Sequence, residues 1–230
     1  MCSVAVLDED DRGIPRSLRL FAACVEAEAC RHAAAARSAG SDLVRAFRGV
    51  ATPEVPIRQF LERVHLIVRW SGDSATRHMV RIDGTCFVLA VLYLHRFLQS
   101  PAAREAGILV EPATAQRLAA VAIFLGTKFG GHAPKKWTIV FELASGLAIR
   151  ADSCVNGCLL FLRAVSFRLF VAYREYDCFS RVLVMDSRSP RVSCATTGSA
   201  GKKRQADAVA REDSHRHIRA CLPPPAVISH

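Results

Sequence analysis

The sequence predicts an all-α protein with one helical bundle, and three observations support this fold class. Two apolar runs, CFVLAVLYLHRFL at 86–98 and LAAVAIFLGTKF at 118–129, are apolar on every side of a helical wheel, which is typical of helices at the centre of a bundle. Other apolar residues recur at helical spacing, and no segment alternates with the period of a strand. The 230 residues, 51% of them hydrophobic, suffice for one substantial core.

The first half of the chain predicts two amphipathic helices before the central pair. After an arm of about fourteen residues, Leu18, Phe21 and Val25 recur at helical spacing and predict a helix over 15–37, which SAGSD at 38–42 ends. A segment at 43–56 follows. Pro56 then opens a helix that continues to about Trp70. The polar, glycine-containing stretch at 71–85 predicts a loop.

The second half predicts the central pair and three further pieces. Both central runs fall short of the roughly 18–20 residues that cross a bilayer, so we expect core helices and no membrane partner. A linker at 101–112 joins them, and the breaker GGHAPKK follows the second run. We expect a short helix at 137–144, another at 150–162, and a helical or extended piece at 166–179. Beyond about Ser187 the composition predicts a largely disordered tail.

Composition narrows the classes of partner. The net charge of +10 favours an acidic partner. However, the arginines are spread along the whole chain together with a surplus of alanine, and no stretch of basic residues alternates with aromatic ones. This pattern disfavours nucleic acid as the partner. The nine cysteines are odd in number and scattered, which predicts reduced thiols in the nucleus or cytoplasm. Cys154 and Cys158 lie one turn apart, yet without a CxxC pair or a nearby histidine we expect core thiols and no metal.

Catalytic motifs are absent from the sequence. It contains no glycine-rich phosphate loop, no HExxH and no GxSxG. His65 and His95 lie within helical runs, where a core or boundary histidine is the better interpretation than a catalytic base. Without a nucleophile and base pair, the sequence predicts a binding protein rather than an enzyme, with no cofactor and no small-molecule substrate.

Five segments, in order, resemble motifs of the plant cyclins of the U or P type, which are similar to the yeast cyclins of phosphate signalling. FRGVATPEVPIRQFLERV at 47–64 resembles the family's F-x-G and proline-rich lead into a helix ending in YLERI, and 86–97 resembles CFVVAYIYLDRF. GTKF at 126–129 resembles the family's AAKF, LASGL at 143–147 resembles its VGGV turn, and FLRAVSFRLFV at 161–171 resembles its FLF-x-x-x-FxLxV segment.

This resemblance implies a regulatory subunit that binds and activates a cyclin-dependent kinase of the PSTAIRE class, in cell-cycle or nutrient-linked regulation. A cyclin packs against the kinase's C helix and moves its glutamate towards the lysine of the third strand. The resemblance implies an N-terminal arm and helix at 1–44, a single cyclin box at 45–175, and a basic, largely disordered tail at 176–230. The expected kinase-binding residues are Arg63, Lys128, Phe129, Leu159 and Leu160.

The chain departs from this pattern at charged positions. His95 stands where cyclins usually carry an aspartate, and the glutamate of the fifth box helix is replaced near Cys158 and Leu159. Gly130 and Gly131 replace an acidic pair, and 72–84 contains an apparent insertion. Two alternatives therefore stay open. One is a degenerate cyclin with weak or no kinase activation. The other is a nucleic-acid-binding cyclin fold of the general transcription-factor type that uses the basic charge and GKKRQ at 201–205.

Overall fold

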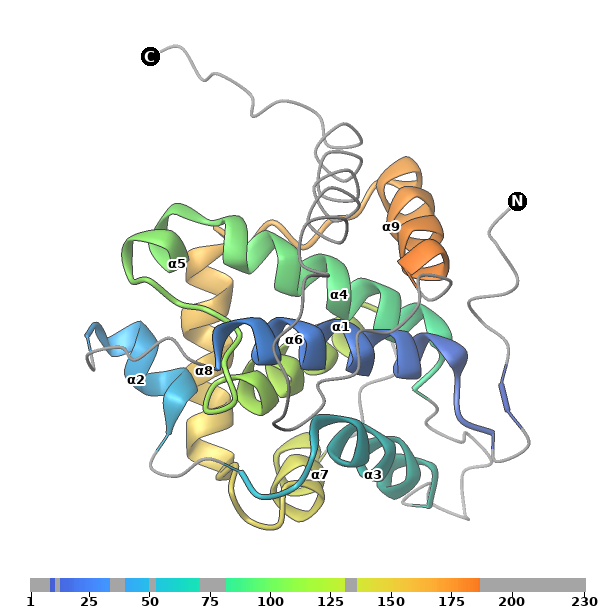
Figure 1. Ribbon diagram of the computed structural model, residues 1–230, viewed down its shortest axis with the longest axis horizontal. Helices are drawn as coiled ribbons and strands as arrows, with labels where there is room; N and C mark the ends of the chain where they lie inside the picture. Colours follow the sequence, from blue (N-terminus) through green and yellow to red (C-terminus); the bar gives the residue numbers. More distant parts are fainter. Residues whose placement is uncertain are drawn as a thin grey trace, which may run out of the picture.

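The computed structural model describes residues 9–10, 13–33, 40–49, 53–70, 82–130 and 136–186, and these form a helical bundle (Figure 1). Within them the structure has nine α-helices and no strand, which confirms the all-α bundle. The helices are α1 (Arg16–His32), α2 (Asp42–Arg48), α3 (Ile57–Trp70), α4 (Gly84–Gln99), α5 (Pro101–Glu105), α6 (Ala115–Phe129), α7 (Trp137–Ala144), α8 (Ala151–Ala164) and α9 (Tyr173–Asp186).

The two apolar runs form the central pair, α4 and α6, which pack against each other in the middle of the bundle. Their backbones touch at Gly126, because a Cβ atom placed there would lie 2.5 Å from the carbonyl oxygen of Cys86. The absence of a side chain at Gly126 therefore allows the close approach of α4 and α6. α1 packs on α4 and α3, α7 packs between α3 and α8, and α8 also packs on α6.

The short helix α2 lies in a part of the chain where we predicted no helix. The Ser41 hydroxyl accepts a hydrogen bond from the backbone N–H of Val44 (3.4 Å), and Gly49 ends the helix with φ +64°. Phe47 is fully buried, with its ring centroid 5.3 Å from that of Phe97. A single aromatic anchor thus attaches α2 to the bundle.

A buried arginine joins α2 to the rest of the bundle. The Arg117 guanidinium donates hydrogen bonds to the carbonyl oxygens of Arg48 (3.0 Å) and Ala148 (2.7 Å). Burial lowers the pKa of Arg117 from its ordinary value. Gly49 leaves the space that the guanidinium occupies, because a Cβ atom there would lie 2.1 Å from Arg117 Cζ.

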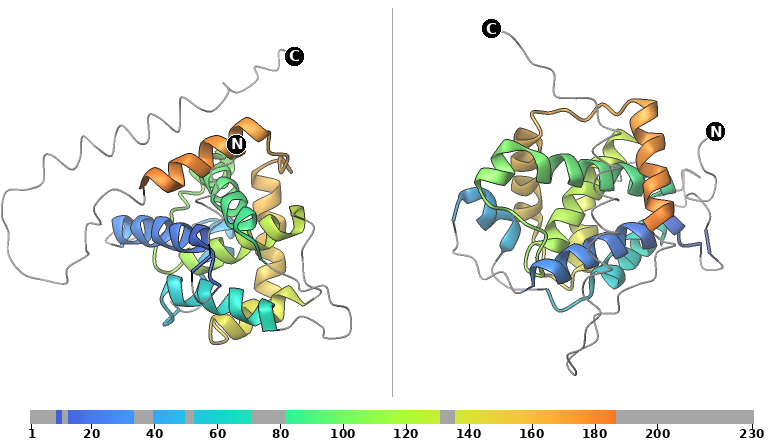
Figure 2. Two further views of the ribbon diagram at one scale, coloured as in Figure 1. Left: turned by 90° about the vertical axis from the view of Figure 1, so that its right-hand side faces the viewer. Right: turned by 45° about the horizontal axis from the view of Figure 1, so that its top comes forward.

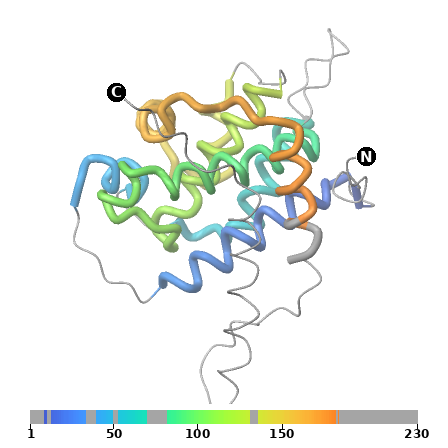
Figure 3. Tube along the Cα trace, turned by 90° about the horizontal axis from the view of Figure 1, so that it is seen from above, coloured from blue at the N-terminus to red at the C-terminus, as the bar shows by residue number. Residues whose placement is uncertain are grey.

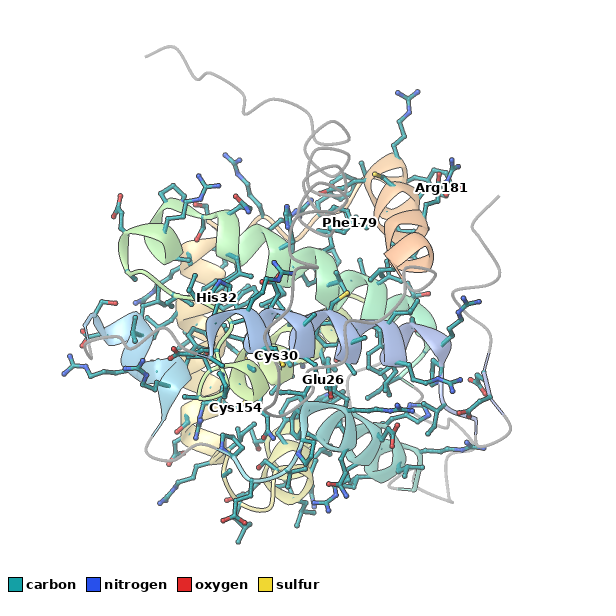
Figure 4. The ribbon with its side chains drawn as sticks, viewed as in Figure 1. Glu26, Cys30, His32, Cys154, Phe179 and Arg181 are labelled. Carbon is teal, nitrogen blue, oxygen red and sulfur yellow. The ribbon has the colours of Figure 1, made fainter. Side chains whose placement is uncertain are left out.

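The last helix, α9, extends past residue 175, where we expected the tail to begin. Phe179 and Leu183 are 4% and 3% exposed, and the Phe179 ring packs edge-on against His95 with centroids 5.4 Å apart. Figure 4 shows Phe179 between α9 and α4, whereas Arg181 points outwards. Residues 176–186 therefore pack on the bundle, while the rest of the expected tail lies outside the described residues.

The described residues also bear on the cysteines, on metal sites and on membrane-spanning helices. The six cysteines there are free thiols, and Cys154 and Cys158 are buried on α8. No group of three or more metal-ligating side chains occurs in the described ranges. No helix among them is long and apolar enough to cross a membrane. Most of the apparent insertion at 72–84, namely residues 72–81, lies outside the described ranges.

Candidate functional site

Lys128 lies in the last turn of α6 with its side chain exposed to solvent. Its ammonium group lies 5.7 Å from the centroid of the Phe124 ring, and no carboxylate or hydrogen-bond acceptor among the described residues contacts it. The helix dipole favours a cation at this end, and the aromatic face adds a weak attraction. The lysine is thus positioned by its own helix and remains available to an acceptor on another molecule.

Phe129 is the exposed apolar neighbour of Lys128, with 51% of its surface open to solvent. Its ring packs edge-on against Tyr93 of α4, at 6.2 Å between centroids. Tyr93 is itself buried, and its hydroxyl donates a hydrogen bond to the carbonyl oxygen of Leu169 (2.9 Å). Phe129 therefore rests on a fixed support while presenting half of its surface outwards.

α8 presents a second set of exposed apolar side chains. Val155 and Leu159, four residues apart and so on one helical face, are 53% and 49% exposed, while the opposite face with Cys158 and Phe161 is buried. Leu160 is half-buried and contributes less to this face. α6 and α8 pack against each other, and Figure 2 shows α8 on the opposite side of the bundle from α1.

The neighbouring helix α7 widens this apolar area. Ile139 and Leu143 are 45% and 56% exposed, and Leu147, in the turn after α7, is 66% exposed. Soluble proteins rarely expose apolar side chains in such numbers on adjacent elements unless a partner covers them. We call the set Lys128, Phe129, Ile139, Leu143, Val155 and Leu159 the α6–α8 surface.

Arg63, the remaining expected site residue, lies on α3 rather than on α6, α7 or α8. It is half-buried, and α3 packs against α1, α6 and α7. Within the described part of the chain no ion pair or hydrogen bond joins Arg63 to another residue. Lys128, Phe129 and Leu159 lie on α6 and α8, which pack against each other, and Arg63 lies on α3, which also packs on α6.

Arg96, the residue after His95, is paired with an acid from a distant part of the chain. Arg96, next to His95, forms an ion pair with Glu175 of α9 (Nη2 to Oε2, 2.6 Å) and donates to the backbone carbonyls of Arg168 and Phe170. The charge of Arg96 is thus neutralised by a carboxylate 79 residues away in sequence. No local pattern could reveal this pairing.

Comparison with known proteins supports one family. A family model described as Cyclin matches residues 16–132, just over half of the 230-residue chain. The match runs from α1 through the end of α6, so it includes Lys128 and Phe129 and starts upstream of residue 45, where we expected the box to begin. No curated protein matches the chain.

Proposed function

The chain belongs to the cyclin family, and we propose that it binds a cyclin-dependent protein kinase through the α6–α8 surface and activates it. Membership of this family gives the chain a regulatory role of the cyclin type, in which the kinase performs the chemistry. The observation that carries the proposal is Lys128, an exposed ammonium without an ion pair in the described structure, at the end of the buried helix α6 and beside exposed apolar side chains.

The chemistry of this surface suits a helix of the partner. Phe129 and Leu159 offer apolar area on which a helix can pack, and desolvation around it strengthens the hydrogen bonds that Lys128 can donate to carbonyl oxygens at the partner helix's C-terminal end. In kinases of this class, moving the C helix brings its glutamate to the lysine that orients the ATP phosphates. The binding free energy of the complex would then favour the active kinase conformation.

The proposed cyclin type, kinase class and cellular role rest on the five motifs between Phe47 and Val171. They support a cyclin of the plant U or P type, a kinase of the PSTAIRE class, and a role in cell-cycle or nutrient-linked regulation in the nucleus or cytoplasm. The ion pair between Arg96 and Glu175 supports retention of an ordered box despite the replacement at His95. It favours a working cyclin over a degenerate copy.

Co-purification with a PSTAIRE-class kinase, followed by titration of the full-length chain, tests this function. We expect the wild-type chain to bind and stimulate the kinase, and Lys128→Glu and Leu159→Asp each to weaken binding at least about tenfold, equivalent to about 1.4 kcal/mol. Arg31→Glu is the control, because Arg31 is exposed on α1, across the bundle from α8. If Lys128→Glu binds like the wild type, the assigned surface is wrong, and if no kinase binds, the function is wrong.

A further inference from the structure

The segment that follows α8 exposes an unusual number of aromatic side chains. Phe167, Phe170 and Tyr173 are 64%, 77% and 61% exposed, and Arg168 and Arg174 between and beside them are exposed as well. We call residues 167–174 the aromatic strip. We did not expect this alternation of aromatics and arginines from the sequence, because apolar residues at these positions are also typical of a buried helix.

The backbone of the aromatic strip is held by α4. The carbonyl oxygens of Arg168 and Phe170 accept hydrogen bonds from Arg96 (2.7 and 3.0 Å), and that of Leu169 accepts one from Tyr93. The side chains of Leu169 and Val171 pack on the core, so their neighbours in sequence point outwards. The exposed aromatics are therefore presented by a fixed backbone, which lowers the entropic cost of binding through them.

The turn that leads into the aromatic strip is strained. Ser166 and Phe167 have φ values of +52° and +57°, in the left-handed region that residues with a Cβ atom rarely adopt. The turn is closed by the hydrogen bond from the backbone N–H of Phe167 to the carbonyl oxygen of Leu162 (2.8 Å). Glycine would relieve the strain at 167, so the phenyl side chain is retained there at a cost to stability.

The aromatic strip continues the α6–α8 surface. Phe129 packs on Tyr93, and the same tyrosine holds Leu169. Leu159 lies one turn before Leu162, whose carbonyl oxygen closes the strained turn. Figure 3 shows the segment running from α8 across the bundle to α9. A partner that covers Phe129 and Leu159 therefore has the aromatic strip beside it.

The charges around this area indicate what the partner carries. The exposed basic side chains of residues 128–174 that have no ion pair in the described structure are Lys128, Lys136, Arg150, Arg163, Arg168 and Arg174. The acids of this stretch without an ion pair there are Glu142 and Asp152. An excess of unpaired cations beside apolar area favours an occupant with both carboxylates and apolar side chains.

We propose that the aromatic strip is a docking site for an acidic, apolar segment of the kinase partner, adjoining the segment bound by the α6–α8 surface. This inference rests on the proposed function. Carboxylates of the partner pair with Arg168 and Arg174, and its apolar side chains pack on Phe167 and Phe170. Aromatic and arginine side chains are enriched at the centres of protein interfaces, and the aliphatic residues Val155 and Leu159 nearby favour a protein over nucleic acid. The chain's own C-terminal segment contains KKR at 202–204, so charge repulsion disfavours it as the occupant.

The test compares variants of the full chain in titrations against the kinase at several salt concentrations. We expect Arg168→Glu with Arg174→Glu to slow association about tenfold and to flatten the salt dependence, because these charges steer the encounter. Phe167→Ser with Phe170→Ser should instead speed dissociation about tenfold. The single variant Phe167→Gly separates binding from folding, because it should raise the melting temperature by removing strain and still weaken the complex.

Other outcomes overturn the inference in distinguishable ways. If the aromatic-strip variants bind the kinase like the wild type while Lys128→Glu does not, the strip is not a docking site and the proposed function stands. If no kinase binds the wild-type chain, both proposals are wrong. If the variants retain kinase binding but lose affinity for a single-stranded oligothymidine probe, the occupant is nucleic acid, which stacks on aromatics, and the protein partner proposed for the strip is wrong.

Discussion

Gly126 offers the sharpest test of how the central helices pack. In Gly126→Ala the new Cβ atom would lie 2.5 Å from the carbonyl oxygen of Cys86, and 3.4 Å from the backbone nitrogen of Ala90. A carbon and a carbonyl oxygen approach no closer than about 3.3 Å even in favourable contacts, so α4 and α6 must separate by about 0.8 Å at this point. Neither contacting atom belongs to a side chain that can rotate away.

Two opposing effects set the size of the change. Alanine is better than glycine inside a helix by about 1 kcal/mol, which favours the variant. Overpacking of a core costs about 1–3 kcal/mol, and a backbone collision between two fully buried helices belongs at the upper end of that range. We therefore expect a net loss of about 2 kcal/mol, which for a chain of this size corresponds to a fall of about 4–8 °C in melting temperature.

The assay is thermal and urea denaturation followed by circular dichroism at 222 nm, with Gly157→Ala of α8 as the matched control. At Gly157 the added Cβ atom would lie 3.4 Å from Val121 Cγ2 and 3.5 Å from Phe47 Cε1, which are ordinary contacts. The free energy of unfolding of this control variant should rise by about 0.5–1 kcal/mol. If Gly126→Ala is as stable as the wild type, or if both variants lose the same stability, the close approach of α4 and α6 is refuted.

Three further predictions concern α4 and its partners. Glu175→Gln should cost about 2–3 kcal/mol in urea denaturation, because Arg96 would keep its partly buried charge without a carboxylate; an unchanged midpoint would contradict the ion pair. Tyr93→Phe should cost about 1 kcal/mol by the same measurement, since the hydrogen bond to Leu169 is lost. Stability of the wild type should fall as pH rises from about 9 towards 12, because burial raises the pKa of Cys86 and of Tyr93 to about 12, so that the folded state keeps protons that the unfolded state has lost. The stabilisation from these two protonated groups is fully present below pH 9. Tyr93→Phe should remove the part of the fall in stability that occurs above pH 10. If the variant loses stability above pH 10 as much as the wild type does, Tyr93 is not the group responsible.

The fold could be predicted where the sequence carries a local signal. The helix Trp137–Ala144 has the bounds expected, because GGHAPKK precedes it and Ser145 and Gly146 follow. α2 escaped prediction because seven residues are too few for helical periodicity, although Ser41 and Gly49 are its caps. Capping residues alone occur in many turns, so they do not distinguish a short helix from a loop.

The candidate site could be predicted only in part, for a different reason. Lys128, Phe129 and Leu159 were expected as kinase-binding residues, and the structure places them on α6 and α8, which pack against each other. The exposure of Phe167 and Phe170 could not be foreseen, because it depends on hydrogen bonds from Arg96 and Tyr93, which lie more than 70 residues away in sequence. Tertiary contacts decide which apolar residues face solvent.

The hydrogen bonds of Arg117 determine which segments of this protein unfold together. Its guanidinium holds carbonyl oxygens from α2, from the turn before α6 and from the loop before α8, so none of these three segments can detach without leaving a buried charge short of acceptors. They should therefore unfold together as one cooperative unit. In native-state hydrogen exchange, the amides of the short helix α2 should then share the opening free energy of the α8 amino-terminal turn rather than exchange as a frayed end.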